Sequence, residues 1–420
     1  MAKRLGVYIH IPFCASKCGY CDFYSLSGCD HMMPDYQDAL IDHIEESAQS
    51  LKSYEVDSVY FGGGTPSFYG ADRIVEIFNT LKLNGNVRLD SEVTVECNPD
   101  STSLNALKLL REEGVNRLSL GVQSANNDLL KLIGRRHNFQ QVKRSMQDAR
   151  DAGFENISLD LIYGLPSQSK SDWAETLARI IELHPEHISC YGLKLEEGTP
   201  MYERYKGSPI LPDDDEQADM YFYAADVLER YGYKQYEISN FAAKGFESKH
   251  NLKYWNHDDY MGFGPGAHSC VGNLRYSFVK DLKQYISGVA RGVSIIDEYR
   301  QIDPMERAVE YIMLGMRTSN GISEHDYRTR CQCDWRPIHK VLLAFAEKGW
   351  AEKTGDRWHF TVPGYLISNT LIGILLEAQA GGRVEGNPWL EEAFAAEEKI
   401  DLPKGEDELF QELYQKTVNK

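Results

Sequence analysis

The chain has 420 residues, of which 42% are hydrophobic and 26% charged, and 45 Lys and Arg against 63 Asp and Glu give a formal net charge of −18. This composition is ordinary for a folded globular protein and excludes a mainly disordered chain or a small disulfide scaffold. Proteins that grip a phosphate backbone are usually basic, so the acidic balance argues against nucleic acid as a partner. No apolar run of about 18 residues or signal-peptide core occurs, so we expect a cytoplasmic protein, where clustered cysteines more often bind metal than form disulfides.

Segments rich in Val, Ile, Leu and Tyr alternate with helical patterns through the first half of the chain. The predicted strands are 7–13, 58–64, 92–98, 117–123, 157–165 and 187–195. Helical patterns such as 106–114 and 174–184 lie between them. Six strand–helix units predict a parallel sheet with helices outside, and they are too few to close an eight-fold barrel. We therefore expect an α/β fold built on a partial (β/α)6 barrel.

The pattern changes after residue 200. A capped amphipathic helix is predicted at 211–233, and the stretch after it is aromatic and rich in glycine. Residues 350–361 read as a hairpin between helical patterns. These shifts predict four regions: a barrel at 1–235, a connecting region at 236–303, a small C-terminal domain at 304–376 and an acidic tail at 377–420.

Unusual residues collect where the predicted strands end. They are the cysteine cluster, GGGTP, ECNP, GVQS, DLIYGLP and CYGLK. The carboxyl ends of parallel strands carry the active site in barrels and doubly wound sheets. Six consecutive strand ends therefore indicate one site more strongly than any single motif does.

The sharpest motif is the group of three cysteines, Cys14, Cys18 and Cys21, directly after the first predicted strand. Iron–sulfur clusters are held by thiolates, normally four for a cubane of four irons, so three leave one iron open. An open position is typical of catalytic metal sites. The alternative is a structural zinc site, which usually needs a second pair of ligands. The pair Cys331 and Cys333 is distant and poorly spaced for that role.

The segment YIHIPFCASKCGYCDFYS resembles the radical S-adenosylmethionine (SAM) superfamily, and within it the HemN/HemW branch. The resemblance of the chain to this branch extends from about residue 5 to about residue 376. The resemblance implies a [4Fe-4S] cluster on the three cysteines, with SAM bound at the open iron and cleaved to a 5′-deoxyadenosyl radical. It implies a winged-helix-like, HemN-type C-terminal domain at 304–376. It also implies SAM-binding roles for Tyr8, Tyr20, Gly63, Gly64, Thr65, Glu96, Gln123, Arg135 and Asp160. Taken alone, a residue of this type at a strand end has a structural role as often as a binding role.

Two activities occur in this branch. Coproporphyrinogen III dehydrogenases oxidatively decarboxylate two propionates, whereas haem chaperones bind haem and deliver it. The dehydrogenase motif has a further cysteine two residues after the third, where this chain has Phe23, and an arm of dozens of residues where only six precede Val7. Both departures favour the chaperone.

The sequence HNLKYW at 250–255 is typical of the chaperone group. Imidazole and phenol groups can both ligate haem iron, and aromatic rings can pack on a porphyrin. The resemblance therefore implies haem-binding roles for His250, Tyr254 and Trp255. The alternative is a loop whose histidine bonds a neighbour while the tryptophan fills the core.

We therefore predict a haem chaperone that binds a [4Fe-4S] cluster, SAM and haem as cargo, and delivers haem to apo-haemoproteins that include respiratory enzymes. No residue is assigned a catalytic role, and whether the chain is an enzyme stays open. Peripheral membrane contact and a homodimer are compatible with this prediction. The alternatives are a coproporphyrinogen III dehydrogenase of porphyrin biosynthesis, another radical SAM reaction such as methyl transfer during haem breakdown, and a zinc-stabilised α/β protein.

Overall fold

The computed structural model describes residues 3–381 and divides the chain into two compact units. The first unit comprises Met1–Lys234, Ser239–Tyr254 and Asp258–Gln301. The second comprises Gln235–Ile238, Trp255–His257 and the chain from Ile302. The acidic tail predicted at 377–420 lies outside the described residues from 382 onward, and its first residues complete the last helix.

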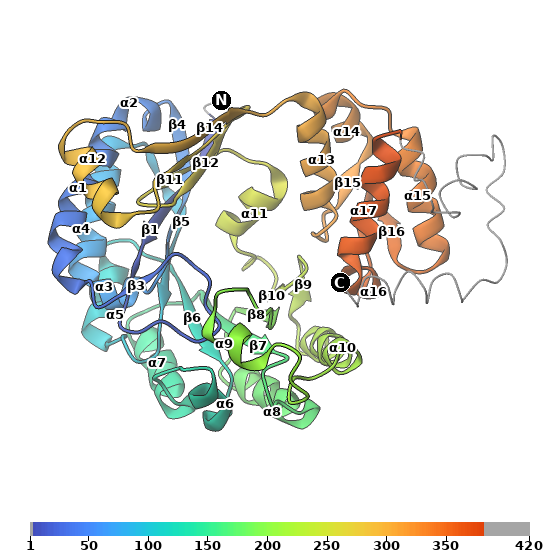
Figure 1. Ribbon diagram of the computed structural model, residues 1–420, viewed down its shortest axis with the longest axis horizontal. Coiled ribbons are helices and arrows are strands. Elements are labelled where there is room, and N and C mark those ends of the chain that lie inside the picture. Colours follow the sequence, from blue (N-terminus) through green and yellow to red (C-terminus); the bar gives the residue numbers. More distant parts are fainter. Residues whose placement is uncertain (1–2, 382–420) are drawn as a thin grey trace. The chain divides into compact units, whose positions relative to one another are not determined.

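The first unit is built on one sheet whose strand order is β14-β13-β12-β11-β1-β4-β5-β6-β7-β8-β10-β9. Six neighbouring strands in its middle are parallel: β1 (Lys3–Ile11), β4 (Tyr54–Gly63), β5 (Val87–Cys97), β6 (Arg117–Gln123), β7 (Ile157–Tyr163) and β8 (His187–Gly192). Each overlaps one of the six predicted strands, although the bounds differ by a few residues, and helices cover the outside of the sheet (Figure 1). The predicted (β/α)6 partial barrel is confirmed.

The helices that follow these strands bury one apolar face each. They are α1 (Met33–Glu46), α2 (Ala48–Leu51), α3 (Pro66–Tyr69), α4 (Ala71–Asn84), α5 (Leu104–Glu112), α6 (Asn127–Leu132), α7 (Phe139–Asp151), α8 (Lys170–Ile181), α9 (Pro200–Tyr205) and α10 (Asp214–Arg230). Capping boxes start α7 at Asn138, α8 at Ser169 and α10 at Asp213. Such caps satisfy the free N–H groups of the first turn and fix where each helix begins.

A short parallel pair follows β1. It consists of β2 (Phe13–Cys14) and β3 (Leu26–Ser27), with the 3-10 helix η1 (Asp30–Met32) after it. This pair closes the loop that carries the three cysteines, because its two strands lie at the two ends of that loop.

The region predicted as an irregular connection instead extends the sheet at both of its ends. It contains β10 (Asn240–Ala242), α11 (Lys249–Asn256), β11 (Tyr260–Phe263), β12 (His268–Val271), β13 (Leu274–Phe278), α12 (Leu282–Ala290) and β14 (Ile296–Gln301). Strand β11 pairs in parallel with β1, and β10 pairs antiparallel with β8. The strands are short and separated by glycine turns, so their periodicity is too brief to stand out in the sequence.

The second unit contains a three-stranded sheet of order β15-β17-β16 packed with helices. Its elements are α13 (Pro304–Gly315), β15 (Ile322–Ser323), α14 (Glu324–Cys331), α15 (Arg336–Glu347), β16 (Ala351–Thr354), β17 (Arg357–Phe360), α16 (Val362–Leu366) and α17 (Ser368–Gln379). Strand β9 (Lys234–Gln235) is the last strand of the large sheet, and the division between the units falls between its two residues. Strands β16 and β17 form the predicted hairpin. Trp335, Phe345 and Trp358 are buried in its core.

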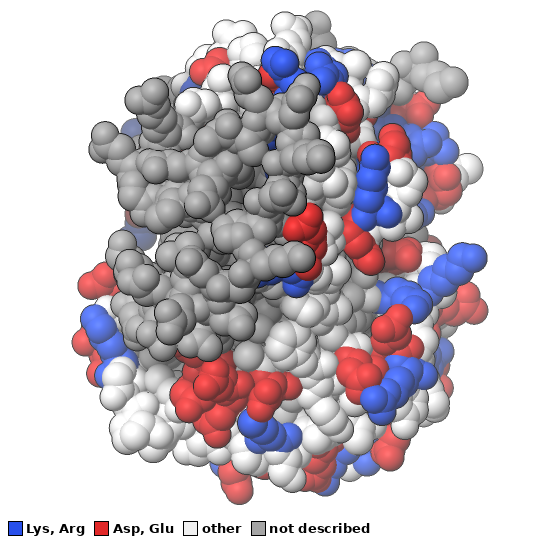
Figure 2. All heavy atoms as spheres, turned by 90° about the vertical axis from the view of Figure 1, so that its right-hand side faces the viewer, with Lys and Arg blue, Asp and Glu red and all other residues white. Residues whose placement is uncertain are grey.

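Acidic and basic side chains are interspersed on the face shown in Figure 2. The described residues visible on that face therefore form no continuous basic surface of the kind that binds a phosphate backbone. None of the helices within residues 3–381 is long and apolar enough to cross a bilayer.

Candidate functional site

The loop after β1 brings the three cysteines to the carboxyl ends of the parallel strands. The Cys14 thiol is buried and lies 3.3 Å from the hydroxyl of Thr65. The half-buried Cys18 accepts a contact from Nη1 of Arg135 at 3.6 Å, and the Cys21 N–H donates to the Cys18 carbonyl at 3.2 Å. All three cysteines line one pocket.

Burial raises the pKa of the Cys14 and Cys21 thiols. A metal that displaces their protons would restore the thiolate form, and the guanidinium of Arg135 supplies a positive charge beside Cys18. Across the described residues, no three His, Cys, Asp or Glu side chains converge closely enough to hold a single metal ion. The cysteines of a cubane each bind a different iron and need not converge on one point, so a three-thiol donor set of this kind fits an iron–sulfur cluster.

The pocket has a volume of about 360 Å³ and is open to solvent at one side. The residues predicted to bind SAM that line it are Tyr20, Gly63, Gly64, Thr65, Glu96, Gln123, Arg135 and Asp160. Tyr8 does not line it. The Tyr8 ring lies one layer behind, stacked on Tyr60, and its hydroxyl bonds Nδ1 of His10 at 3.0 Å.

The GGGTP segment forms the turn between β4 and α3. Gly63 has a φ of +111°, and a Cβ there would lie 2.5 Å from the His10 ring. A Cβ on Gly64 would lie 2.7 Å from the Phe13 carbonyl oxygen. Only glycine fits these two positions, so the backbone itself forms this wall of the pocket. The Gly64 N–H donates to the Ile11 carbonyl at 2.7 Å, which ties the turn to the end of β1.

Glu96 is the acidic group next to this turn. Its Oε1 accepts a hydrogen bond from the Tyr60 hydroxyl at 2.8 Å, and its Oε2 accepts one from the Gly63 N–H at 3.1 Å. Burial raises the pKa of Glu96 to about 7. A carboxylate held in this way has further lone pairs with which it can accept two hydroxyl hydrogen bonds from a ligand.

The ends of β5, β6 and β7 supply further lining residues. Arg135 donates from Nη2 to Oδ1 of Asn98 at 2.6 Å and to the Gly121 carbonyl at 2.5 Å. Gln123 has a φ of +66°, a left-handed conformation that costs a non-glycine residue energy and that collects at functional sites. Asp160 accepts hydrogen bonds from the hydroxyls of three serines, Ser119, Ser158 and Ser189.

Sequence reasoning missed several polar residues that line the pocket on or directly after its parallel strands. They include Tyr60, Asn98, Arg117 and His187. A signal for Arg117 exists in the alternation of β6. Polar residues and glycine at every second position from Arg117 to Gln123 line the pocket, and the residues between them are buried and apolar. That alternation would have extended the site below the strand ends.

The HNLKYW motif lies in α11, and only its Asn251 lines the pocket. The His250 side chain is fully buried. Its Nδ1 bonds the Ser58 hydroxyl at 2.9 Å and its Nε2 bonds the Tyr254 hydroxyl at 2.9 Å. Burial lowers the pKa of His250 to about 3, so the ring is neutral and both nitrogens are engaged. Trp255 is half-buried and belongs to the second unit.

Comparison with known proteins agrees with this geometry. Residues 8–180 match the radical SAM superfamily and residues 302–367 match the HemN C-terminal domain. The chain is similar to the protein named "Heme chaperone HemW" of Bacillus subtilis (strain 168), with 36% identity over 88% of this chain and 99% of that protein. It is 32% identical to the protein of the same name in Escherichia coli (strain K12), over 89% of this chain and 98% of that one.

The fold is similar to the solved structure of coproporphyrinogen III oxidase (HemN) from Escherichia coli. The two share a TM-score of 0.79 and 24% sequence identity, over 89% of this chain and 91% of that chain. At this identity the likeness concerns the fold alone. The identity to the curated relatives, which extends over nearly their whole length, places the chain more narrowly. The chain belongs to the HemW family of the radical SAM superfamily.

Proposed function

We propose that the chain is a haem chaperone that binds a [4Fe-4S] cluster, SAM and haem, and delivers the haem to apo-haemoproteins. One observation carries the proposal. Three thiols and the residues expected to bind SAM, apart from Tyr8, line a single pocket, in a chain that matches nearly the whole length of relatives named "Heme chaperone HemW".

The proposal gives each wall of the pocket a task. Cys14, Cys18 and Cys21 would hold the cluster, which when bound supplies an open iron and an electron to SAM. The backbone of the GGGTP turn would approach the SAM amino group, since no side chain stands in the way. Glu96 would accept hydrogen bonds from the ribose hydroxyls. Tyr20, Gln123, Arg135 and Asp160 would complete the SAM pocket, with Tyr8 supporting it from behind.

Phe23 supports the chaperone against the dehydrogenase. Its ring is 67% exposed and lines the mouth of the pocket. The extra cysteine of the dehydrogenase motif falls at this position, and this chain has no thiol to place there. An exposed aromatic ring at a pocket mouth is suited to contact with a flat apolar ligand.

The haem site is proposed within HNLKYW, with His250 or Tyr254 as the iron ligand and Trp255 packing on the macrocycle. Nε2 of His250 is bonded to the Tyr254 hydroxyl, so ligation through this nitrogen requires that hydroxyl to move. Cytoplasmic location, delivery to respiratory enzymes, peripheral membrane contact and a homodimer belong to the same proposal.

Haem titration of the cluster-loaded protein under anaerobic conditions tests the ligand. If His250 ligates, His250→Ala loses haem, whereas Tyr254→Phe binds it more tightly because Nε2 is released. If Tyr254 ligates, Tyr254→Phe loses the haem instead. Wild-type protein that retains no haem would overturn the proposal.

A further inference from the structure

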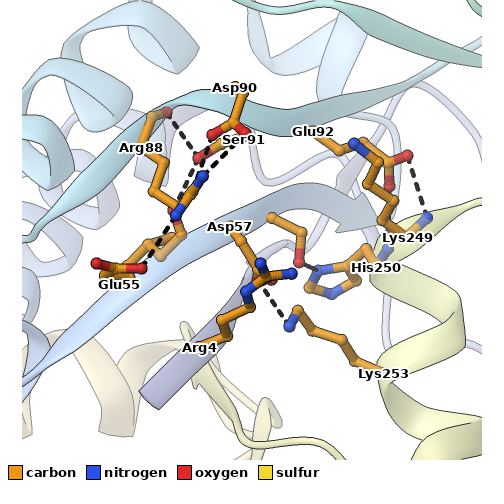
Figure 3. Close-up of polar contacts among 12 residues, drawn as sticks. Arg4, Glu55, Asp57, Arg88, Asp90, Ser91, Glu92, Lys249, His250 and Lys253 are labelled. Atoms are coloured by element: carbon orange, nitrogen blue, oxygen red, sulfur yellow. Dashed lines mark hydrogen bonds and ion pairs between the residues drawn. The ribbon is translucent and has the colours of Figure 1, made fainter. Parts of the chain in front are cut away.

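The helix that carries His250 is fastened to the strands of the barrel at its first turn. The buried Glu92 side chain, on β5, accepts the N–H groups of Lys249 at 3.1 Å and of His250 at 3.0 Å (Figure 3). The first N–H groups of a helix have no partner within the helix, and a carboxylate at this end is favoured by the helix dipole. Glu92 therefore fixes the position at which α11 begins.

A largely buried ion pair holds the next turn of the helix. The Lys253 ammonium points from α11 toward β4 and lies 2.6 Å from Oδ1 of Asp57 (Figure 3). The two side chains are 6% and 20% exposed. A Cβ on Gly6 of β1 would lie 2.7 Å from the Lys253 side chain and 3.3 Å from the His250 ring. The helix thus lies directly against β1 and β4 with no space between.

The ring of Tyr60 lies between this helix and the pocket. It stacks on the His250 ring with centroids 5.2 Å apart, and on the Tyr8 ring with centroids 6.3 Å apart. Its hydroxyl donates to Glu96. A Cβ on Gly62 would lie 2.8 Å from the Tyr60 ring and 3.1 Å from the Glu96 carboxyl carbon, so both groups are closely confined.

We propose that Tyr60 is a positioning residue that orients the Glu96 carboxylate toward the ligand, and that α11 holds Tyr60 in place through His250. The position of α11 on the strands then affects how tightly the pocket binds SAM, although His250 does not line the pocket. The inference rests on the proposed function, since it takes SAM as the ligand of Glu96. It adds a role for His250 that needs no bond to iron.

The groups around Glu96 set its pKa, so a change in that pKa reports on the Tyr60 hydrogen bond. Groups that face Glu96 come from five elements: Tyr60 on β4, Arg117 on β6, Asp160 on β7, Tyr8 on β1 and Tyr254 on α11. Burial raises the pKa of Glu96, and the Tyr60 hydrogen bond opposes that rise because it stabilises the carboxylate. Loss of the hydroxyl therefore moves the pKa of Glu96 further upward.

The test is SAM affinity of anaerobic, cluster-loaded protein measured across pH. Tyr60→Phe keeps the ring and removes only the hydroxyl. We expect SAM to bind about tenfold more weakly at pH 7, as for the loss of a hydrogen bond to a charged group. We also expect the pH at which affinity is half-maximal to rise by about one unit. Tyr233→Phe is the matched control, because it removes a buried hydroxyl that bonds the Pro185 carbonyl outside the pocket.

The link to α11 is tested by the ring of His250. His250→Ala removes the ring beneath Tyr60 and should weaken SAM binding about fivefold, the loss of a stacked contact. His250→Phe should restore most of the affinity, since it stacks but cannot ligate iron. Ser58→Ala, which removes only the Nδ1 partner, serves as the milder variant should His250→Ala fail to fold.

The outcomes separate the two levels of inference. Wild-type protein that binds no SAM would overturn the proposed function. Wild-type protein that binds SAM, with Tyr60→Phe equal to Tyr233→Phe at every pH, would overturn the role of Tyr60. Equal SAM affinity in wild type and in His250→Ala, or in wild type and in Ser58→Ala where the alanine variant does not fold, would overturn the role of α11.

Discussion

Glu92 and Glu96 lie four residues apart on β5, on the same face of the strand, and they end in different surroundings. Glu92 points toward α11 and uses both oxygens to accept helix N–H groups. Glu96 points into the pocket, where a tyrosine and one backbone N–H leave room for a ligand. One strand thus supplies a structural carboxylate, Glu92, next to α11, and a binding carboxylate, Glu96, in the pocket. We call these two regions of the barrel interior the α11 end and the pocket end.

The same division holds for the residues around them. At the α11 end, His250 and Lys253 are buried and each has a partner on β4. At the pocket end, thiols, glycines and Glu96 border open space. Residue type alone does not distinguish the two ends, because both contain acids, histidines and tyrosines. Substitutions at the α11 end should change stability most and affect binding only indirectly, through Tyr60, whereas substitutions at the pocket end should change binding directly.

The largest effect is expected at the cysteines. Cys18→Ser should abolish the iron–sulfur cluster, because a hydroxyl is a poor ligand for this iron and only three thiols are available. Iron and sulfide analysis with visible absorption spectra measures the loss. Cys29→Ser is the control, since Cys29 is a half-buried free thiol that does not line the pocket. A full cluster in Cys18→Ser would contradict the assignment of the pocket end.

The α11 end should respond most strongly at its ion pair. Lys253→Met leaves the partly buried Asp57 with only the more distant Arg4, 3.9 Å away, and should lower the free energy of unfolding by about 2 kcal/mol. Asp57→Asn in the same chain should recover part of this loss. Chemical denaturation measures both, with the exposed Lys108→Met as control. A change below about 0.5 kcal/mol would show that the pair does not hold α11.

Glu96 should give a pH dependence of opposite sign in stability and in binding. Its pKa is raised to about 7 in the fold, so the free protein loses stability as pH rises from about 4.5 toward 7, where the buried carboxyl ionises. SAM binding, which uses the carboxylate, should strengthen through the same range. Glu96→Gln should flatten both curves, raise the free energy of unfolding at pH 8 by about 1 kcal/mol and weaken SAM binding there. Unchanged curves would place the titration elsewhere.

Glu92→Gln should have the smallest effect on stability and binding. Comparing it with Glu96→Gln tests whether the two carboxylates of β5 have different roles. The amide keeps one acceptor for the helix N–H groups, so the free energy of unfolding should fall by about 1 kcal/mol. SAM affinity should fall less than in Glu96→Gln, since Glu92 does not line the pocket. An equal loss of affinity in the two variants would contradict the division of β5 into two ends.

The pocket end was largely predictable from the sequence because its signals are local. The three cysteines span eight residues, and the glycine turn follows directly on a strand. The residues predicted to bind SAM, apart from Tyr8, line one pocket, since parallel strands bring their carboxyl ends to one edge. The depth of the pocket was missed, because it depends on alternation within β6 rather than on the strand ends.

The α11 end was not predictable, because its partners are distant in sequence. Ser58 bonds His250 across 192 positions, and Glu92 caps a helix 157 residues away. No local pattern marks either residue. Strands β11 to β14 escaped prediction for a related reason. Strand β11 joins the sheet by pairing with β1, which lies about 250 residues earlier in the sequence. Long-range pairing of this kind becomes visible only in the fold.

An anaerobic comparison of haem with coproporphyrinogen III separates a haem chaperone from a dehydrogenase. Cluster-loaded protein receives SAM, a reductant and either haem or coproporphyrinogen III. We expect haem to be retained and then transferred to an apo-haemoprotein, and coproporphyrinogen to be recovered unchanged. Decarboxylation of coproporphyrinogen to protoporphyrinogen, with no retention of haem, would contradict the account and make the protein an enzyme of porphyrin synthesis.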